Sequence, residues 1–305
     1  MSKNMKDLKN DYDNIEIPNE LDDFINKGIM KGRNEMKKKN SKSKWFKGAA
    51  STAAVFVAFT LSVNTIPAFA NSIIDIPVIG ELVKIVQIDK ESVTGGKITD
   101  GADVDSIDIK ENGKGESIVI GISNDNIIAD IAPHFDVEYN EYPYSLTFTI
   151  SGARGLSAEK YFDSLKENKF VSDVYKIITM DDSMVRFNVT LNGPVKVEVQ
   201  EYKDPAQIIV NLTEADQITE KIIYSVRSAS YPNGEQIGIM EEMFGVESSR
   251  IIKDKDGTFL VEAGTFERIE EANEKIEEIK NNFGSEMKIY IEERNAGDIP
   301  KVISE

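Results

Sequence analysis

One uninterrupted apolar stretch, from Ala49 to Ala70, constrains this chain more than any other feature of the sequence. Its 22 residues contain no charged side chain, and a helix of about 20 apolar residues is long enough to cross the hydrocarbon core of a bilayer. Six lysines precede the stretch, with Trp45 and Phe46 at the boundary, whereas the first charges after it are acidic. Because lysine marks the cytoplasmic flank of a span, we expect a transmembrane helix over residues 45–70, with the N-terminus inside.

Two other interpretations of this stretch remain open. Ala68-Phe69-Ala70 resembles the small-residue cleavage site of a signal peptide, and cutting there would shed everything that follows. A signal peptide normally starts near the beginning of a chain, however, whereas 44 residues precede Trp45. A buried helix of a soluble protein is the second alternative, and the adjoining lysines and the lack of a polar face argue against it.

Charge divides the chain at the same place. Residues 1–47 contain 12 Lys and Arg against 8 Asp and Glu, whereas the remainder contains 24 against 45. A basic segment beside a membrane span suits the anionic lipid of the cytoplasmic leaflet. The acidic remainder disfavours nucleic acid as a partner, because such binding depends on neutralising phosphates.

The sequence carries little that could support catalysis. It contains no cysteine, so thiol catalysis, disulfides and zinc–thiolate sites are excluded. The sequence has no nucleophile elbow of the G-x-S-x-G type that could work with the single histidine, His134. We therefore interpret His134 as a surface residue. Phosphate-binding, dinucleotide-binding and calcium-binding motifs are absent from the sequence too. We therefore expect no enzymatic activity, no catalytic residue, no cofactor and no metal site.

Residues 1–44 are predicted to form a cytoplasmic tail that contains one amphipathic helix. Pro18 and Asn19 are a typical helix start, and acidic residues in the first turn precede basic ones later, as the helix dipole favours. An isolated helix of this kind is marginal in water, so its stripe would gain by packing into the groove of a partner. A lysine-rich tether without a partner is the alternative. The apolar stripe consists of Leu21, Phe24, Ile25 and Ile29.

The order of these segments resembles the N-terminal region of membrane-anchored anti-sigma factors of Firmicutes, including the anti-sigma-V type and the family built on DUF4179. The resemblance covers roughly residues 14–88 and rests on I-E-I-P-N-E-L-D-D-F-I-N-K-G-I-M-K-G-R, the lysine tract, the apolar span and I-P-V-I-G-E-L-V-K-I-V. It implies that the tail sequesters an extracytoplasmic-function sigma factor through Leu21, Phe24, Ile25 and Ile29. The His/Cys set of the zinc-binding anti-sigma class is missing.

Residues 71–115 are predicted to be a membrane-proximal segment and a linker. Ile73 to Ile88 is rich in Ile and Val, and it is consistent with a short helix on the membrane surface or with a strand that docks on the next domain. Asp89 to Gly115 is polar and contains Gly95-Gly96 and Asn112-Gly113, which is typical of a linker, with room for a hairpin.

Residues 116–215 alternate like half-buried strands. Ser145 to Ile150 and Val185 to Leu191 are clear examples, and five or more such strands favour a β-sandwich. Y-P-Y-S-L-T-F-T-I-S-G-A and the strands after it resemble AMIN domains, which implies binding to peptidoglycan. A sandwich that serves only as a spacer is the alternative.

Residues 216–305 contain an internal repeat of a strand followed by a helix, and the predicted order is βαββαβ, a ferredoxin-like layout. The second copy, F-L-V-E-A-G-T-F, resembles the SPOR domain, which implies binding of glycan strands on the sheet face without helices. By alternation we expect Val226 and Val261 to face the helices. The candidate glycan-binding residues on the other face are Arg227, Ser230, Leu260 and Glu262.

The predicted fold class is α+β and multidomain, with one transmembrane helix, an AMIN-like β-sandwich and a SPOR-like ferredoxin-like domain. The predicted function is a single-pass membrane regulator that is similar to an anti-sigma factor, with its later domains outside the cell membrane, where they sense or bind cell wall. A change in those domains would expose the membrane-proximal segment to a protease. A cell-wall or division protein whose tail binds no sigma factor, and an amidase regulator, are the alternatives.

Overall fold

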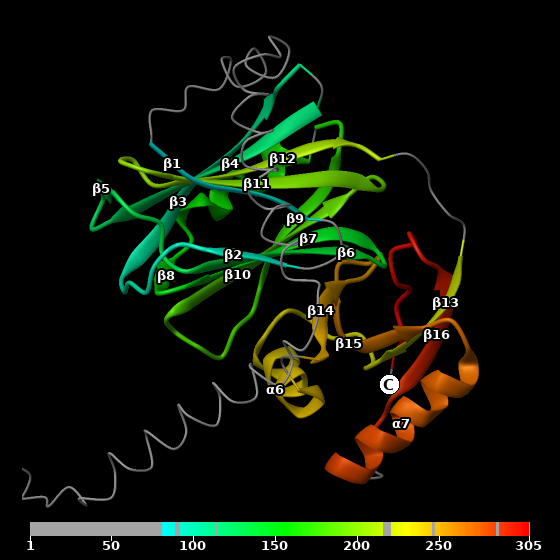
Figure 1. Cartoon of the computed structure of the whole chain (residues 1–305). Helices are drawn as coiled ribbons and strands as arrows, with labels where there is room; N and C mark the ends of the chain where they lie inside the picture. Colours follow the sequence, from blue (N-terminus) through cyan, green and yellow to red (C-terminus); the bar gives the residue numbers. More distant parts are fainter. Residues whose placement is uncertain are drawn as a thin grey trace, which may run out of the picture. The chain divides into compact units, whose positions relative to one another are not determined.

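The computed structural model describes residues 81–88, 92–113, 115–166, 168–215, 221–245, 248–284 and 287–304 (Figure 1). The chain divides into two compact units, Met1–Ala70 and Asn71–Glu305, and every described residue belongs to the second. The predicted tail helix and the predicted span over residues 45–70 lie outside the described residues. Within the described part, none of the helices combines the length and the apolar character that a membrane crossing requires.

The predicted fold class, α+β with one transmembrane helix, is wrong. The described residues are mainly β: sixteen strands lie in three sheets, against three α-helices and one short 3-10 helix. None of those helices can span a membrane. The β content was underestimated because alternating Ile and Val residues already begin at Glu81, in a segment that was predicted to be largely linker.

Two sheets form a β-sandwich over residues 81–214. The first has the order β1-β11-β12-β4-β3-β8, with β5 beside β4, and the second has the order β2-β6-β7-β10-β9. The strands of the first sheet are β1 (Glu81–Ile88), β3 (Ala102–Glu111), β4 (Gly115–Asn124), β5 (Ile127–Ile128), β8 (Ala153–Gly155), β11 (Val195–Lys203) and β12 (Gln207–Glu214). Those of the second are β2 (Val93–Gly95), β6 (Phe135–Glu141), β7 (Tyr144–Ser151), β9 (Val171–Ile177) and β10 (Met184–Leu191).

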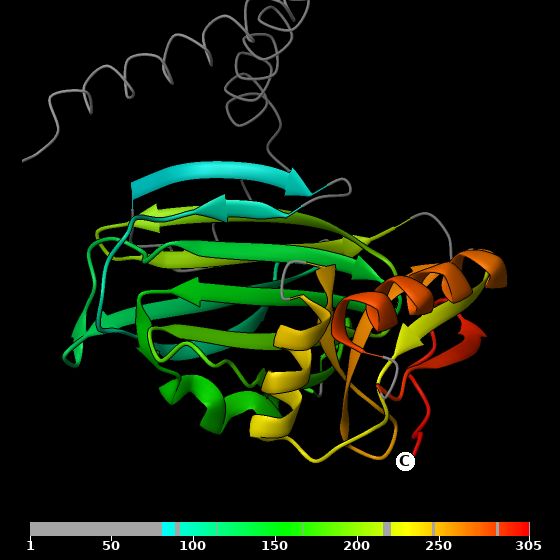
Figure 2. The ribbon, with the colours of Figure 1, turned by 90° about the horizontal axis from the view of Figure 1, so that it is seen from below.

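The two sheets form two layers, one above the other in Figure 1, and Figure 2 shows the same ribbon from below. The sandwich core lies between these sheets. Along β7, Leu146, Phe148 and Ile150 alternate into this core and are fully buried, as the period of two in their sequence predicts. Phe148 stacks on Phe187 of β10 with ring centroids 4.6 Å apart. After Gly155 a 3-10 helix, η1 (Ser157–Tyr161), leads into the short helix α5 (Phe162–Leu165).

The segment predicted to be a membrane-proximal linker supplies strands to both sheets instead. Of the two interpretations of Ile73 to Ile88, the docked strand is the one that the described residues show, because β1 pairs with β11 in antiparallel register. Farther along, β2 pairs with β6 and β3 pairs with β4. The sandwich therefore begins at Glu81 rather than near residue 116.

The third sheet follows in the order β14-β15-β13-β16, and its strands and helices occur along the chain in the predicted order βαββαβ. Val226 and Val261 belong to the buried cluster that contains the helix residues Ile237 and Ile276, so the prediction that both valines face the helices is confirmed. The elements are β13 (Ile222–Arg227), α6 (Glu235–Phe244), β14 (Arg250–Lys253), β15 (Phe259–Phe266), α7 (Ile269–Phe283) and β16 (Tyr290–Asn295).

The sandwich and the third sheet share a packed boundary. Tyr175 and Ile177 of β9 belong to the buried cluster of the third sheet, and the Tyr175 ring meets the edge of Phe259 at 5.6 Å between centroids. Beside them, Lys253 Nζ lies 2.8 Å from the Asp173 carboxylate. This boundary brings polar residues of both parts together, and two candidate sites lie along it.

Candidate functional site

The four residues predicted to bind glycan lie close together, but their predicted exposure is wrong. Arg227 at the end of β13 and Glu262 in β15 are register partners. Arg227 and Leu260 are each 0 % exposed, and Glu262 is 2 % exposed. Ser230 follows β13 and is half-buried. The face of the sheet opposite the helices is therefore covered rather than open.

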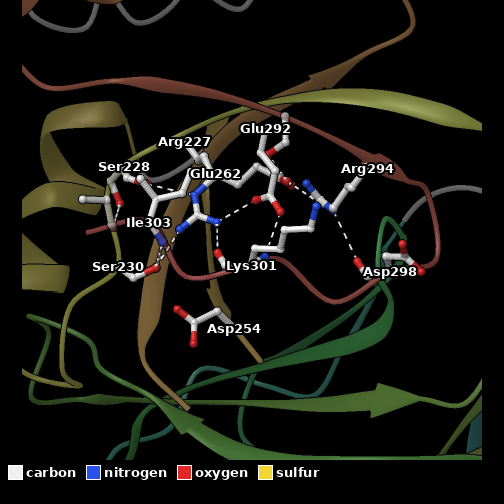
Figure 3. A network of polar contacts seen from close by, with 12 residues as sticks. Arg227, Ser228, Ser230, Asp254, Glu262, Glu292, Arg294, Asp298, Lys301 and Ile303 are labelled. Atoms are coloured by element: carbon white, nitrogen blue, oxygen red, sulfur yellow. Dashed lines mark hydrogen bonds and ion pairs between the residues drawn. The ribbon is translucent and has the colours of Figure 1, made fainter. Parts of the chain in front are cut away.

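Arg227 is the centre of a buried polar network (Figure 3). Its Nη1 donates to Glu292 Oε2 at 2.6 Å and to the carbonyl oxygen of Lys301 at 2.7 Å. Its Nη2 donates to Ser230 Oγ at 2.8 Å, and its Nε donates to the carbonyl oxygen of Ser228. Burial lowers the pKa of Arg227, and the hydrogen bond to Glu292 opposes that effect. An arginine with this many acceptors remains charged.

Glu262 is the second carboxylate of the network. It accepts hydrogen bonds from Ser225 Oγ at 2.5 Å, from Arg294 Nη2 at 2.8 Å and from Arg250 Nε at 2.7 Å. Burial alone would raise the pKa of Glu262, but the charges of Arg250 and Arg294, together with the hydrogen bonds, hold it below its usual value. Glu262 is therefore a structural counter-ion for two arginines.

Two segments that are distant in the sequence cover this face of the sheet. The turn between β6 and β7 brings the carbonyl oxygen of Tyr142 into contact with Arg250 and with Arg294 Nη2. The segment after β16 returns across the sheet, where the backbone N–H of Lys301 donates to Glu292 at 2.8 Å and that of Ile303 to Ser230 Oγ. Glycan binding by these residues stays a prediction, and it requires this covering segment to move.

Acid is expected to destabilise the fold through Glu262. Because its pKa in the folded chain is lowered, the stability it contributes is present above its unfolded pKa of about 4.3 and is lost as the pH falls through the folded value. We expect Glu262→Gln to reduce the difference in unfolding free energy between pH 7 and pH 3, measured by denaturant titration.

The matched control for this prediction is Glu274→Gln, since Glu274 lies exposed on α7. That variant is expected to keep the pH dependence of the parent. An unchanged pH dependence in Glu262→Gln would contradict the assignment of Glu262 as a charged buried group.

A second candidate site is a cleft of about 850 Å³ between the sandwich and the third sheet. Arg186 of β10 crosses its floor and binds Glu241 of α6 through two hydrogen bonds, at 2.8 and 2.9 Å. Their side chains are 11 % and 5 % exposed. Neither residue stood out in the sequence. The available signal was a glutamate at a buried position of α6 together with an arginine between the apolar residues of β10.

Of the other residues singled out from the sequence, only some lie among the described residues. Leu21, Phe24, Ile25 and Ile29, which are predicted to bind a sigma factor, lie outside the described residues. His134 is exposed, as expected for a surface residue. Within the described ranges, acidic and histidine side chains form no group that could hold a metal ion.

Comparison with known proteins finds a family match that extends into the first strands of the described fold. Residues 40–130 match the family model "Domain of unknown function (DUF4179)". The anti-sigma-V factor RsiV of Bacillus subtilis (strain 168) is 36% identical over 110 residues, which make up 36% of this chain and 34% of that protein. No solved structure matches the chain. The resemblance of the later residues to AMIN and SPOR domains is not confirmed. The chain is thus similar to an anti-sigma factor over about a third of the length of each protein.

Proposed function

We propose that this protein is a non-enzymatic regulator that sequesters an extracytoplasmic-function sigma factor. The observation that carries this proposal is the 36% identity to an anti-sigma factor over 110 residues. The predicted order of tail helix, lysine tract and apolar stretch supports it. The proposed place of action is the cell membrane, on the grounds of the charge and apolar pattern of residues 37–70.

The proposed sigma-binding element is the apolar stripe of the tail. Leu21, Phe24 and Ile25 follow a helix start at i, i+3 and i+4, and Ile29 extends the same face by one turn. A stripe of this width fits a hydrophobic groove, in which each side chain is an anchor. The largest of the four is Phe24, so its burial supplies the largest share of the binding free energy.

Replacing Phe24 by aspartate is expected to abolish capture of the sigma factor. A carboxylate in an apolar groove must give up its hydration without an ion-pair partner, which costs several kcal/mol. The measurement is co-purification of an extracytoplasmic-function sigma factor with the full chain.

The matched control is Lys27→Asp, because Lys27 belongs to the same predicted helix outside the stripe. This variant is expected to retain the sigma factor. If neither the parent chain nor Lys27→Asp retains any sigma factor, while the chain still binds denuded glycan, the protein is a wall-binding protein and the proposal fails.

We further propose that the sandwich and the third sheet receive a signal from the cell wall, and that release of the sigma factor follows a change at β1. This strand is the first described element after the apolar stretch, and it lies at the edge of its sheet. Of its eight residues, only Ile88 is buried. An edge strand that is held by so little core surface is a suitable link between a signal-receiving domain and a segment that becomes accessible to a protease.

A further inference from the structure

The cleft between the sandwich and the third sheet has walls from both parts. One wall comes from β6, β7, β10 and the loop before β10, and the other from α6, β14 and β15. Its volume of about 850 Å³ lies within the range of sites that hold drug-sized molecules or short peptides, and such sites favour the boundary between two parts of a fold. Two ion pairs hold these walls in place: Arg186 of β10 binds Glu241 of α6 across the boundary, and Arg250 of β14 binds Glu262 of β15 within the third sheet.

The two arginines of the cleft are committed to carboxylates. Arg186 gives two hydrogen bonds to Glu241, and Arg250 binds Glu262 and the carbonyl oxygen of Tyr142. An anionic ligand would therefore have to displace a buried carboxylate from its counter-ion, which costs several kcal/mol. The committed arginines thus disfavour phosphate and carboxylate groups as ligands of this cleft.

Further carboxylates line the same cleft without a direct ion pair to any described residue. Glu138 and Glu242 form no side-chain hydrogen bond or ion pair within the described residues. Among the described residues, the Asp181 carboxylate accepts hydrogen bonds only from Ser183, and these bonds lower the pKa of Asp181. Glu138 is an exposed residue of β6, yet partial desolvation raises its pKa, and the charges of Arg250 and Arg186 oppose that effect. A ligand cation placed beside Glu138 would stabilise the charged carboxylate and offset the desolvation that raises its pKa.

Apolar side chains lie beside these carboxylates. Met180 is 48 % exposed, and with Ile177 and Met184 it lines one wall. Methionine adapts its shape to a bound chain better than branched residues do, and it is frequent at surfaces that bind peptides. The ligand that fits both the charge and the apolar wall therefore carries ammonium groups on aliphatic stems.

We propose that this cleft binds a short cationic peptide, with lysine-type side chains whose ammonium groups pair with Glu138 and Glu242 and whose methylene stems pack on Met180. This site is separate from the tail, so it does not depend on whether the tail binds a sigma factor. It also differs from the glycan site that the sequence predicts, because it lies across the boundary and uses none of the four predicted residues except Glu262, which serves as the counter-ion of Arg250.

The proposal is tested by isothermal titration of the full chain with acetylated trilysine amide. The matched probe is the same peptide with every side-chain amine acetylated, which keeps the stems and removes the charges. We expect binding of the first peptide only, and affinity that falls with added salt. Glu138→Gln combined with Glu242→Gln is expected to weaken binding roughly five- to tenfold, the effect of losing two solvent-accessible ion pairs.

The control variant is Glu274→Gln, which removes one exposed carboxylate on α7 and is expected to leave the affinity unchanged. Equal weakening by Glu274→Gln and by the cleft variants would show general attraction to an acidic chain and overturn the proposal. Absence of trilysine binding at millimolar concentration would overturn it as well. Binding of tri-N-acetylglucosamine that depends on Glu138 and Glu242 would overturn the ligand class in favour of glycan.

Discussion

Replacing Arg227 by alanine is expected to lower the free energy of unfolding by about 3–5 kcal/mol, the range for removing one partner of a buried ion pair. The reason is the carboxylate that remains. Glu292 is 6 % exposed and accepts from Arg227 Nη1 at 2.6 Å, so the substitution leaves a buried charge that retains only the backbone N–H of Lys301. The Lys301 carbonyl and the Ser230 hydroxyl lose a donor at the same time. Denaturant unfolding of the full chain, monitored by far-UV circular dichroism, measures the change in unfolding free energy.

Arg154→Ala is the matched control, because Arg154 also pairs with a carboxylate, but it does so at the surface. Its Nε and Nη2 lie 2.9 and 3.0 Å from Asp100, but both side chains are more than half exposed. Exposed pairs contribute little, because water already solvates both charges. A loss for Arg227→Ala that is no larger than that for Arg154→Ala would mean that water reaches the network.

A second variant separates the ion pair from the packing around it. Arg227→Met combined with Glu292→Leu removes both charges and keeps most of the volume, and such replacements are often neutral or stabilising. We expect this double variant to recover a large part of the stability that Arg227→Ala loses. If the double variant does not recover this free energy of unfolding, the loss comes from the contacts with Ser230 and Lys301, which attach the covering segment. The buried charge of Glu292 would then not be its cause.

The pattern of the sequence predicted strands and their inner faces well. In β7 the alternation of Leu146, Phe148 and Ile150 was enough, because a period of two with one apolar face specifies both the strand and the side that is buried. The helical spacing of Ile269, Ala272, Ile276 and Ile279 likewise predicts α7 and a core stripe. The last three are buried, but Ile269, at the start of the helix, is 44 % exposed. These are local properties of the chain.

What the pattern did not predict is the cover on the second face of the third sheet. Alternation correctly placed Arg227 and Glu262 opposite the helices, and polar residues on such a face normally indicate solvent. The cover comes from the turn at Tyr142 and from Lys301 and Ile303, which are distant in the sequence. No local signal links these segments. The informative feature was chemical: three arginines (Arg227, Arg250 and Arg294) and two glutamates (Glu262 and Glu292) lie on paired strands, and ion pairing lets both carboxylates be buried.

The segment that matches the family model contains only part of the first sheet. Residues 40–130 include β1, β3 and β4, but β1 does not pair with either of the other two. The strands β11 and β12 lie between β1 and β4 in the sheet. The matched segment therefore cannot complete its sheet alone, and β1 depends on a strand that begins at Val195 for all its ladder hydrogen bonds.

The attachment of β1 to β11 is weak by its own energetics. One buried isoleucine contributes roughly 1.5–3 kcal/mol, and the net gain from a backbone hydrogen bond is about 1 kcal/mol. Ordering a residue costs roughly 1–2 kcal/mol, which offsets most of that gain over eight residues. The side-chain contacts add little: Lys84 Nζ donates to the carbonyl oxygen of Thr94, and Lys203 pairs with Glu81 at the exposed end. We therefore place β1 at the low-stability end of the fold.

Trypsin is expected to cut after Lys84 in the native chain, and a disulfide between β1 and β11 is expected to slow that cut roughly tenfold or more, because cleavage follows the population of the opened strand. The chain has no cysteine, so Gln87→Cys with Glu198→Cys joins two register partners without a competing thiol. Glu198→Cys with Asn211→Cys joins β11 to β12 instead and is the matched control, with rapid cutting retained. Equal cutting in the oxidised and reduced forms of the first pair would show that trypsin reaches Lys84 in the docked strand, and release through β1 would then lose its structural basis.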